Sequence, residues 1–408
     1  NYTIFKSSMD QSVDFNRLLE KEVQQFIKDH EKDDESVLVL KNKEILGIPV
    51  ATIAQQIVGR RKAKTKLPSL YSTPAIVYPP KLNLEQCSSK VTAQFKAGLI
   101  KGKLSADLTG GFGIDSLYLA KSFTRVMHIE PNAALLQIVK HNHEALGTHN
   151  IIYHESDAES FLIATHDHFD LIYIDPSRRS TGNRKVFKFS ECSPNVVALM
   201  PTLLERSDFV LIKASPLIDI QQAIRELGFV SQVYIVGYDN ECKEVLFMVS
   251  KLKAEPIIKA IDLSEDQTGN EPFSFTLSEE NKSEVSYSEP LSFLYEPTAM
   301  VLKAGAFKLV GKKFGLKKIA PNTHLYSSNE IVPEFPGRIF KVVNFLKSDS
   351  KSVREFLPDG YANIISRNYP LTPSQLRKKL KTIDGGQKFV IGFSGVNKKH
   401  LVLATRVK

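Results

Sequence analysis

Hydrophobic and polar residues follow two different periods along this chain, and the change between them divides it. Over roughly the first hundred residues, apolar side chains recur at helical spacing, as in 14–27 and 51–58, which predicts a mainly helical region. From Lys103 onward, short apolar runs alternate with amphipathic helical stretches. This alternation predicts an α/β region with a mostly parallel sheet covered by helices on both faces.

The apolar runs predict a sheet of seven strands. The last two strands are separated only by residues 237–243, too few for a helical crossover, so they should pair antiparallel. The expected strands are 104–108, 126–129, 151–154, 171–174, 209–212, 232–236 and 244–249, and the main helices between them are 114–122, 133–146 and 218–227.

A second α+β pattern follows a polar, acidic stretch that begins after Lys253 and reads as a boundary. Within that stretch, apolar and polar side chains alternate over residues 273–277 as in a strand, which predicts a hairpin. Thr372 and Gln375 flank a helix start at Pro373 in the arrangement of a capping box. The further expected helices are 299–307 and 350–357, and the expected strands are 339–345, 362–366, 389–393 and 401–405.

The chain has 408 residues and a net charge of +9, which favours polyanionic partners. Three clusters are candidates for nucleic-acid contact, although the first could equally be a solvated helix end: Arg60, Arg61 and Lys62; Lys312 and Lys313; and Arg377, Lys378 and Lys379. The three cysteines are isolated, which suggests neither a metal site nor disulfides and fits a cytoplasmic setting. We expect neither a membrane span nor a signal peptide.

The most informative segment is residues 103–115, in which a short strand runs through an acidic residue into a Gly-rich turn and a helix. Such a turn lets backbone N–H groups approach a nucleotide cofactor closely. The candidate cofactor-binding residues of this segment are Asp107, Thr109, Gly110, Gly111, Gly113 and Asp115.

The acids at this turn decide between two kinds of cofactor. A dinucleotide would bring its pyrophosphate close to Asp107 and Asp115. In addition, Ser116 occupies the position where a dinucleotide-binding motif has its third glycine. The ammonium group of a sulfonium-bearing amino acid would instead find acceptors there. S-adenosyl-L-methionine (SAM) therefore fits better than a nicotinamide dinucleotide.

Acidic residues also follow the next three strands, where ligands bind in open α/β sheets. Glu130 is placed to accept hydrogen bonds from ribose hydroxyls, and Asp157, followed by Ala158, could meet an adenine amino group. Asp175 and Pro176 follow the fourth strand and precede Arg178 and Arg179.

The order and spacing of these motifs resemble those of class I SAM-dependent methyltransferases over roughly residues 100–250. In enzymes of this class that methylate a nitrogen, the motif after the fourth strand is Asp/Asn-Pro-Pro-aromatic, and the resemblance implies that Asp175 and Pro176 hold a target amine. Here Arg178 and Arg179 replace the aromatic residue, and arginine can stack on a base or grip a phosphate. Alternatively, the two arginines pair with acids of their own loop.

The whole arrangement is similar to a bacterial methyltransferase family with a C-terminal THUMP-like domain, on the evidence of residues 363–380 followed by Gly385 and Gly386. The resemblance implies a Rossmann-like fold with four parts. These are a helical N-terminal region (1–95), a SAM-dependent methyltransferase domain (96–255), a ferredoxin-like module (256–335) and a THUMP-like domain (336–408).

Because THUMP domains bind structured RNA, the resemblance implies an enzyme that methylates a base nitrogen in tRNA or rRNA. Two other hypotheses remain open: a methyltransferase acting on a protein or small molecule, and a non-catalytic RNA-binding protein.

Overall fold

The computed structural model describes residues 15–178, 188–264 and 271–408, so the predicted site residue Arg179 lies outside the described residues. The chain forms two compact units, one of residues 1–230 and 247–253 and the other of 231–246 and 254–408. Among the described residues, no helix is both long and apolar enough to cross a membrane.

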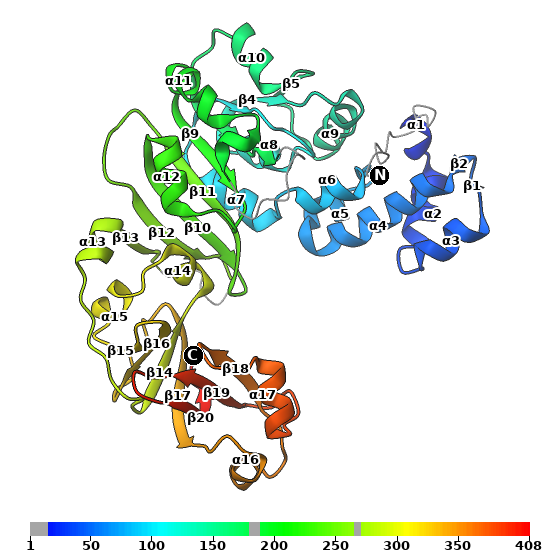
Figure 1. Cartoon of the computed structure of the whole chain (residues 1–408). Coiled ribbons are helices and arrows are strands. Elements are labelled where there is room, and N and C mark those ends of the chain that lie inside the picture. The colour runs from blue at the N-terminus through cyan, green and yellow to red at the C-terminus, as the bar shows by residue number, and fades with distance from the viewer. Residues whose placement is uncertain (1–14, 179–187, 265–270) are drawn as a thin grey trace. The chain divides into compact units, whose positions relative to one another are not determined.

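The N-terminal region is helical, as predicted, apart from a short hairpin of β1 and β2 (Figure 1). The predicted helix at 51–58 extends further, through the basic cluster at 60–66. The elements are α1 (Phe15–Leu18), α2 (Lys21–Asp29), α3 (Glu35–Lys41), β1 (Glu44–Ile45), β2 (Ile48–Pro49), α4 (Val50–Lys66), α5 (Pro68–Ser72), α6 (Lys81–Gln86) and α7 (Lys90–Leu99).

The first large sheet contains all seven predicted strands and two more. Its order is β13-β12-β10-β11-β9-β6-β3-β4-β5. The strands are β3 (Gly102–Asp107), β4 (Phe123–Ile129), β5 (Ile151–His154), β6 (Phe169–Ile174), β9 (Ser207–Ala214), β10 (Val230–Tyr238), β11 (Glu241–Val249), β12 (Ile257–Asp262) and β13 (Phe273–Thr276).

The prediction of seven strands was too low because β12 pairs parallel with β10 and β13 pairs antiparallel with β12. This confirms the hairpin expected around 273–277. It also places both strands in the first sheet, although the sequence assigned residues 256–335 to a ferredoxin-like module. The polar stretch after Lys253 concealed the pairing, since strand pairing depends on partners that are distant in sequence.

Strands β3, β4, β5, β6 and β9 run parallel, and helices flank them (Figure 1). Residues 171–174 are fully or almost fully buried, as expected for a central strand covered on both faces. The connecting elements are α8 (Ile114–Leu119), α9 (Ala133–Ala145), α10 (Ala158–Ala164), β7 (Ser177–Arg178), a 3₁₀ turn (Phe189–Glu191), β8 (Cys192–Ser193), α11 (Val196–Arg206) and α12 (Ile220–Leu227).

The second sheet has seven strands in the order β15-β16-β14-β17-β20-β19-β18. Its two ends approach each other, since Asn368, just after β18, donates a hydrogen bond of 3.1 Å to Thr323 at the start of β16. The strands are β14 (Phe293–Pro297), β15 (Lys317–Ala320), β16 (Thr323–Ser328), β17 (Gly337–Phe345), β18 (Asn363–Arg367), β19 (Lys388–Ser394) and β20 (Lys399–Arg406). The helices are α13 (Leu277–Lys282), α14 (Ala299–Ala304), α15 (Leu309–Lys313), α16 (Ser350–Phe356) and α17 (Pro373–Leu380).

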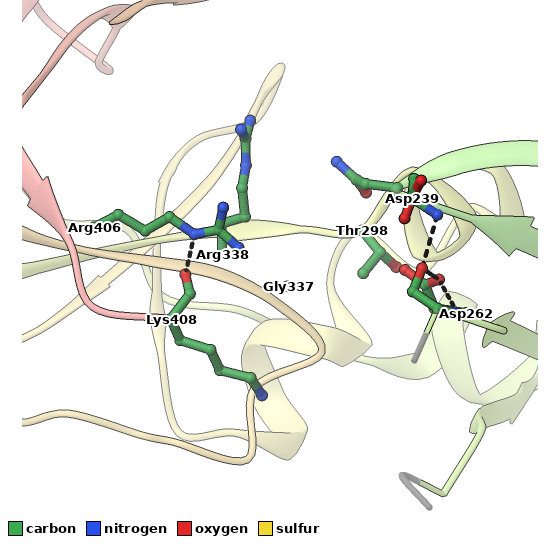
Figure 2. Close-up of a pocket in the computed structure, with 9 residues that line it drawn as sticks. Asp239, Asp262, Thr298, Gly337, Arg338, Arg406 and Lys408 are labelled. Atoms are coloured by element: carbon green, nitrogen blue, oxygen red, sulfur yellow. Dashed lines mark hydrogen bonds between the residues drawn. The ribbon is translucent and has the colours of Figure 1, made fainter. Parts of the chain in front are cut away.

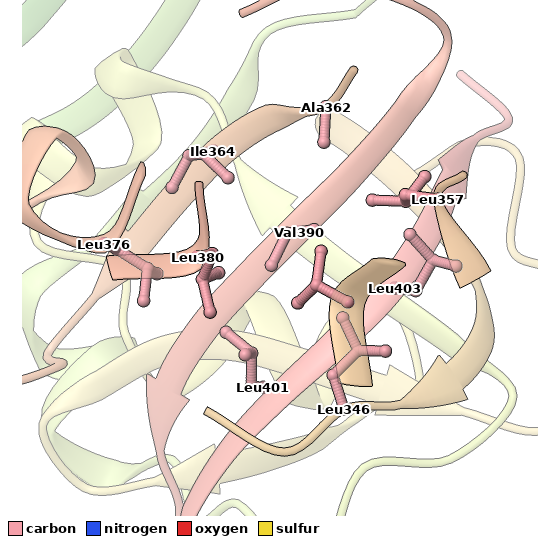
Figure 3. Packing of buried hydrophobic residues seen from close by; sticks show 10 residues of the cluster. Leu346, Leu357, Ala362, Ile364, Leu376, Leu380, Val390, Leu401 and Leu403 are labelled. Carbon is pink, nitrogen blue, oxygen red and sulfur yellow. The ribbon is translucent and has the colours of Figure 1, made fainter. Parts of the chain in front are cut away.

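Each face of the second sheet has its own core. On one face, leucines of α17 pack against β18, β19 and β20 (Figure 3). The other face is lined by side chains such as Leu294, Phe340 and Phe393. Helix α17 begins with the predicted capping box of Thr372 and Gln375, whereas α14 ends three residues before the predicted end, because Gly305 adopts a left-handed conformation with φ 85°.

Candidate cofactor and acceptor site

The Gly-rich turn lies between β3 and α8 and is shaped by two glycines that the interior leaves no room to replace. A Cβ at Gly113 would lie 2.6 Å from Val139 Cγ1, and Gly113 also has φ +73°. A Cβ at Gly110 would lie 2.2 Å from the ring of His128. The turn therefore packs directly on α9 and β4, and its position is fixed by the core of the domain.

Beneath the turn, Asp107 belongs to a buried polar chain. Its carboxylate accepts hydrogen bonds from the Thr109 N–H at 3.1 Å and from the Ser116 hydroxyl at 2.7 Å. Ser116 Oγ also lies 2.8 Å from His128 Nδ1, which must donate because the hydroxyl proton points to Asp107. Burial raises the pKa of Asp107 to about 7 and lowers the pKa of His128 to about 3. Ser116 thus links the turn to β4.

Glu130, directly after β4, holds the turn from its other side. Its carboxylate accepts hydrogen bonds from the Gly111 N–H at 3.0 Å and the Asn132 N–H at 2.9 Å. Burial raises the pKa of Glu130. The structure therefore brings the first and second predicted motifs into direct contact.

Asp157 lies at the N-terminus of α10, which starts at the buried Ala158. The Asp157 carboxylate accepts a hydrogen bond of 2.7 Å from the Ser160 N–H and another of 3.0 Å from the Ser160 hydroxyl, and these bonds lower its pKa. Its first structural task is thus to cap a helix. A role toward an adenine amino group stays a prediction.

Asp175, after β6, is tied to the Gly-rich turn through its backbone. Its N–H donates a hydrogen bond of 2.7 Å to Thr109 Oγ1. Its carboxylate forms an ion pair with Lys213 of β9, a residue that the sequence did not single out. Pro176 is buried, and Arg178 lies in the short strand β7. The predicted roles of Pro176 and Arg178 stay predictions.

Asp115 was expected to meet a cofactor ammonium group, but the chain supplies a cation of its own. Lys96 of α7 is 2% exposed, and its Nζ lies 3.0 Å from Asp115 Oδ1. Hydroxyls of Ser88 and Tyr173 donate to Asp115 Oδ2 at 2.8 and 3.0 Å. Although burial acts in the opposite direction, the charges of Lys96 and Lys213 keep the pKa of Asp115 below its usual value. Lys96 had no sequence signal, because a lysine on a helix is usually exposed.

The candidate RNA-binding residues of α4 are all paired within the chain. Arg60 bonds to Glu31 at 3.0 Å, Arg61 to Glu35 at 2.9 Å, and Lys62 forms an ion pair with Glu85. Their charged groups therefore fasten α4 to its neighbours rather than standing free as a basic patch. A role of these three residues in RNA binding stays a prediction.

The other candidate cations are a mixed set. Lys313 donates to the Ser274 carbonyl at 2.6 Å, and Arg377 forms an ion pair with Asp384, whereas Lys312, Lys378 and Lys379 are exposed. Exposed lysines on α17 are compatible with a surface that contacts a polyanion.

Comparison with known families matches the C-terminal part of the chain. Residues 293–336 match the model of a ferredoxin-like domain, and residues 337–406 match that of a THUMP-like domain. No curated protein sequence matches the chain.

The crystal structure of a candidate methyltransferase from Porphyromonas gingivalis W83 is 31% identical, with a TM-score of 0.87, and the alignment covers 97% of this chain and 100% of that one. The chain belongs to the same family as that protein. The resemblance to methyltransferases with a THUMP-like domain is thereby confirmed, and so is the Rossmann-like α/β fold with C-terminal ferredoxin-like and THUMP-like domains.

Two shorter proteins whose structures were solved in complex with S-adenosylhomocysteine (SAH) also match. A candidate methyltransferase from Streptococcus mutans is 12% identical with a TM-score of 0.30, over 40% of this chain and 97% of that one. TrmK from M. capricolum is 15% identical with a TM-score of 0.32, over 40% of this chain and 68% of that one.

Proposed function

We propose that this protein is a SAM-dependent methyltransferase that modifies a base nitrogen in structured RNA. The family relation supports methyl transfer, and the THUMP-like domain and the exposed lysines of α17 support an RNA acceptor. The observation that carries the proposal is that Gly111 bonds to Glu130 while Thr109 bonds to the backbone of Asp175. These bonds join the ends of three adjacent parallel strands, where α/β folds bind ligands.

The residues at this edge suit SAM. Among the described residues other than its two chain neighbours, a Cβ at Gly111 would meet only the Thr109 carbonyl oxygen within 4 Å, at 3.7 Å, so these residues leave space for a ligand on that side of the turn. Glu130 offers a half-buried carboxylate to ribose hydroxyls beside it. Bound SAM would supply an electrophilic methyl group on a sulfonium centre.

Asp175 is the residue placed to act on the acceptor. Its side chain is 36% exposed, so it can accept a hydrogen bond from an incoming amine N–H. That bond directs the nitrogen lone pair toward the methyl group and gives the released proton an acceptor. Lys213 forms an ion pair with one carboxylate oxygen of Asp175 and leaves the other oxygen free of that contact. The carboxylate therefore stays available as an acceptor while its orientation is fixed.

The proposal predicts that a labelled methyl group is transferred from SAM to total RNA. Nuclease treatment of the product should then release the label. Asp175→Asn should lower transfer at least about a hundredfold, the range of general-base contributions, while SAM affinity in calorimetry changes little. Asp208→Asn is the matched control, since Asp208 is an exposed acid of the same domain that pairs with His168 on the surface. Transfer to a nuclease-resistant acceptor would point to a protein or small molecule, and equal loss of SAM binding would remove the role of Asp175.

A further inference from the structure

The second compact unit contains a cavity of about 660 Å³ that no motif of the sequence indicated. It lies where the turn between β10 and β11, the end of β12, the start of α14, the start of β17 and the end of β20 meet (Figure 2). The cavity is large enough for a drug-sized or nucleotide-sized group. The residues lining it are Asp239, Asn240, Asp262, Ser264, Thr298, Gly337, Arg338, Arg406 and Lys408.

One wall of the cavity carries a surplus of positive charge, because the register of the strands places two arginines there. Glu296 pairs with Arg338 across β14 and β17, and Phe340 pairs with Arg406 across β17 and β20. Since residues two apart in a strand share a face, Glu296, Arg338 and Arg406 lie on one face of the sheet. The β register therefore brings two arginines to the same end of the sheet.

A single buried carboxylate orders the arginines of this region. Glu296 is 3% exposed and accepts from Arg338 Nε at 2.9 Å, and it forms a second ion pair with Arg367 of β18. Two guanidinium groups thus share one carboxylate, which leaves net positive charge beside the cavity. A fixed guanidinium loses less entropy when it binds an oxyanion.

Backbone carbonyls, rather than acids, position the remaining two cations. Arg406 Nε donates to the Lys408 carbonyl at 2.9 Å, and Lys408 Nζ donates to the carbonyls of Pro333 and Phe335 at 2.8 and 3.0 Å. Within the described residues, no hydrogen bond from the Nη atoms of Arg406 is found. Figure 2 shows Arg338, Arg406 and Lys408 together on this wall. Arg338 shares the single charge of Glu296 with Arg367, whereas Arg406 and Lys408 have no acidic side-chain partner among the described residues, so this wall of the cavity is net positive.

The opposite wall has the reverse chemistry. Asp239 and Asn240 form the turn with φ of 52° and 55°, and the Asp239 N–H donates to Ser264 Oγ at 2.7 Å. Asp262 accepts from the Ser264 N–H at 3.1 Å with one of its carboxylate oxygens. The wall thus presents carboxylate oxygens, which are acceptors for amino and hydroxyl groups.

We propose that this cavity binds one unpaired nucleotide of the RNA acceptor, with its phosphate against Arg338 and Arg406 and its base amino group or ribose hydroxyls against Asp239 and Asp262. The assignment rests on the proposed RNA acceptor. A phosphate matches the arginine wall, because guanidinium groups bind oxyanions through two parallel hydrogen bonds. The base amino group and the ribose hydroxyls of the same nucleotide carry the N–H and O–H donors that match the carboxylate wall. The carboxylates would repel a second phosphate.

Binding of a labelled single-stranded RNA of about 20 nucleotides tests the assignment, a length that covers one or more binding sites of this kind. Arg406→Gln should weaken this RNA about tenfold and reduce the slope of log affinity against log salt by about 0.7, the value for one phosphate contact on a single strand. Lys399→Gln is the matched control, because Lys399 is exposed at the other end of the same strand and should change affinity less than about threefold. Asp239→Asn removes a carboxylate but keeps a residue suited to positive φ, and it should also weaken the RNA.

Two further measurements separate this assignment from the proposed function. AMP titrated by calorimetry should compete with the RNA in the parent protein and bind less tightly to the Arg406→Gln variant. Equal RNA affinity in the parent, Arg406→Gln and Asp239→Asn proteins would overturn the assignment, whether or not AMP binds. Methyl transfer to RNA that persists with unchanged KM in Arg406→Gln would overturn it while leaving the proposed function intact, whereas absence of transfer in the parent protein would remove the function itself.

Discussion

Replacing Lys96 by Met should destabilise the first compact unit through the charge left behind on Asp115. Methionine keeps the length of the buried stem, so the loss is mainly electrostatic. Two unit charges 3.0 Å apart attract by about 5.5 kcal/mol at an effective dielectric of about 20. The hydroxyls of Ser88 and Tyr173 remain on Asp115, which reduces the expected net loss to about 3 kcal/mol, the lower end of the range for breaking a buried pair.

The pH dependence identifies the cause of this loss. The pKa of Asp115 is depressed in the folded protein, so the pair stabilises above the usual carboxyl pKa of 3.8 and loses its effect as the pH falls through the folded pKa. Without Lys96 that pKa rises, and acidification protonates the stranded carboxylate. The deficit of Lys96→Met should therefore be largest near pH 7 and shrink toward pH 4.

Urea unfolding followed by circular dichroism measures this deficit, because the chain has no tryptophan. Hydrogen exchange of peptides from α7 and α8 assigns the change to the first of the two compact units. The double variant Lys96→Met/Asp115→Asn should recover more than half of the loss and show no acid-dependent gain. A single variant within about 1 kcal/mol of the parent, or a double variant no better than the single one, would refute the reasoning.

Two further predictions concern the support of the Gly-rich turn. Burial lowers the pKa of His128 to about 3 and that of His143 to about 4, below the unfolded value of about 6.5, so each histidine makes the protein less stable below pH 6.5, by up to about 1.4 kcal/mol per pH unit. Asp107 acts in the opposite direction, because burial raises its pKa to about 7 and acidification below that value favours the folded state. In the Asp107→Asn variant, which removes this opposing group, a urea midpoint independent of pH between 7.5 and 5.5 would contradict the prediction for the histidines. Gly113→Ala should cost at least about 2 kcal/mol and weaken SAM binding, because of its positive φ and the contact with Val139. The control is Gly98→Ala on α7, where a Cβ would meet no other described residue within 4 Å beyond its chain neighbours and its own helix backbone, so this variant should be more stable by about 0.5–1 kcal/mol. Equal urea midpoints for the two variants would show that the turn tolerates a side chain.

The order of motifs along the chain was enough to predict the fold class and to expect that the acids after successive strands lie close together. The carboxyl ends of parallel strands meet at one edge of a sheet, so the sequence alone predicts that an acid after each strand lies near its neighbours. The contacts of Gly111 with Glu130 and of Thr109 with Asp175 agree with that expectation.

Residues without a local pattern could not be found in this way. Lys96 reads as an ordinary surface residue of α7, and Lys213 as the polar end of a strand. Each becomes informative only once folding has placed it beside an aspartate. The same holds for Arg60, Arg61 and Lys62, which read as a free basic cluster because the acids that pair with them, Glu31, Glu35 and Glu85, are distant in sequence.

By itself, then, the sequence determined the helical and strand periods, the Gly-rich turn and the order of the acids after successive strands, because these depend on local spacing. Only the tertiary structure decided which charges are paired, that β12 and β13 join the first sheet, and that Arg338 and Arg406 face Asp239 across one cavity. The physical reason is that pairing and burial depend on contacts between residues distant in sequence, and no local pattern encodes those partners.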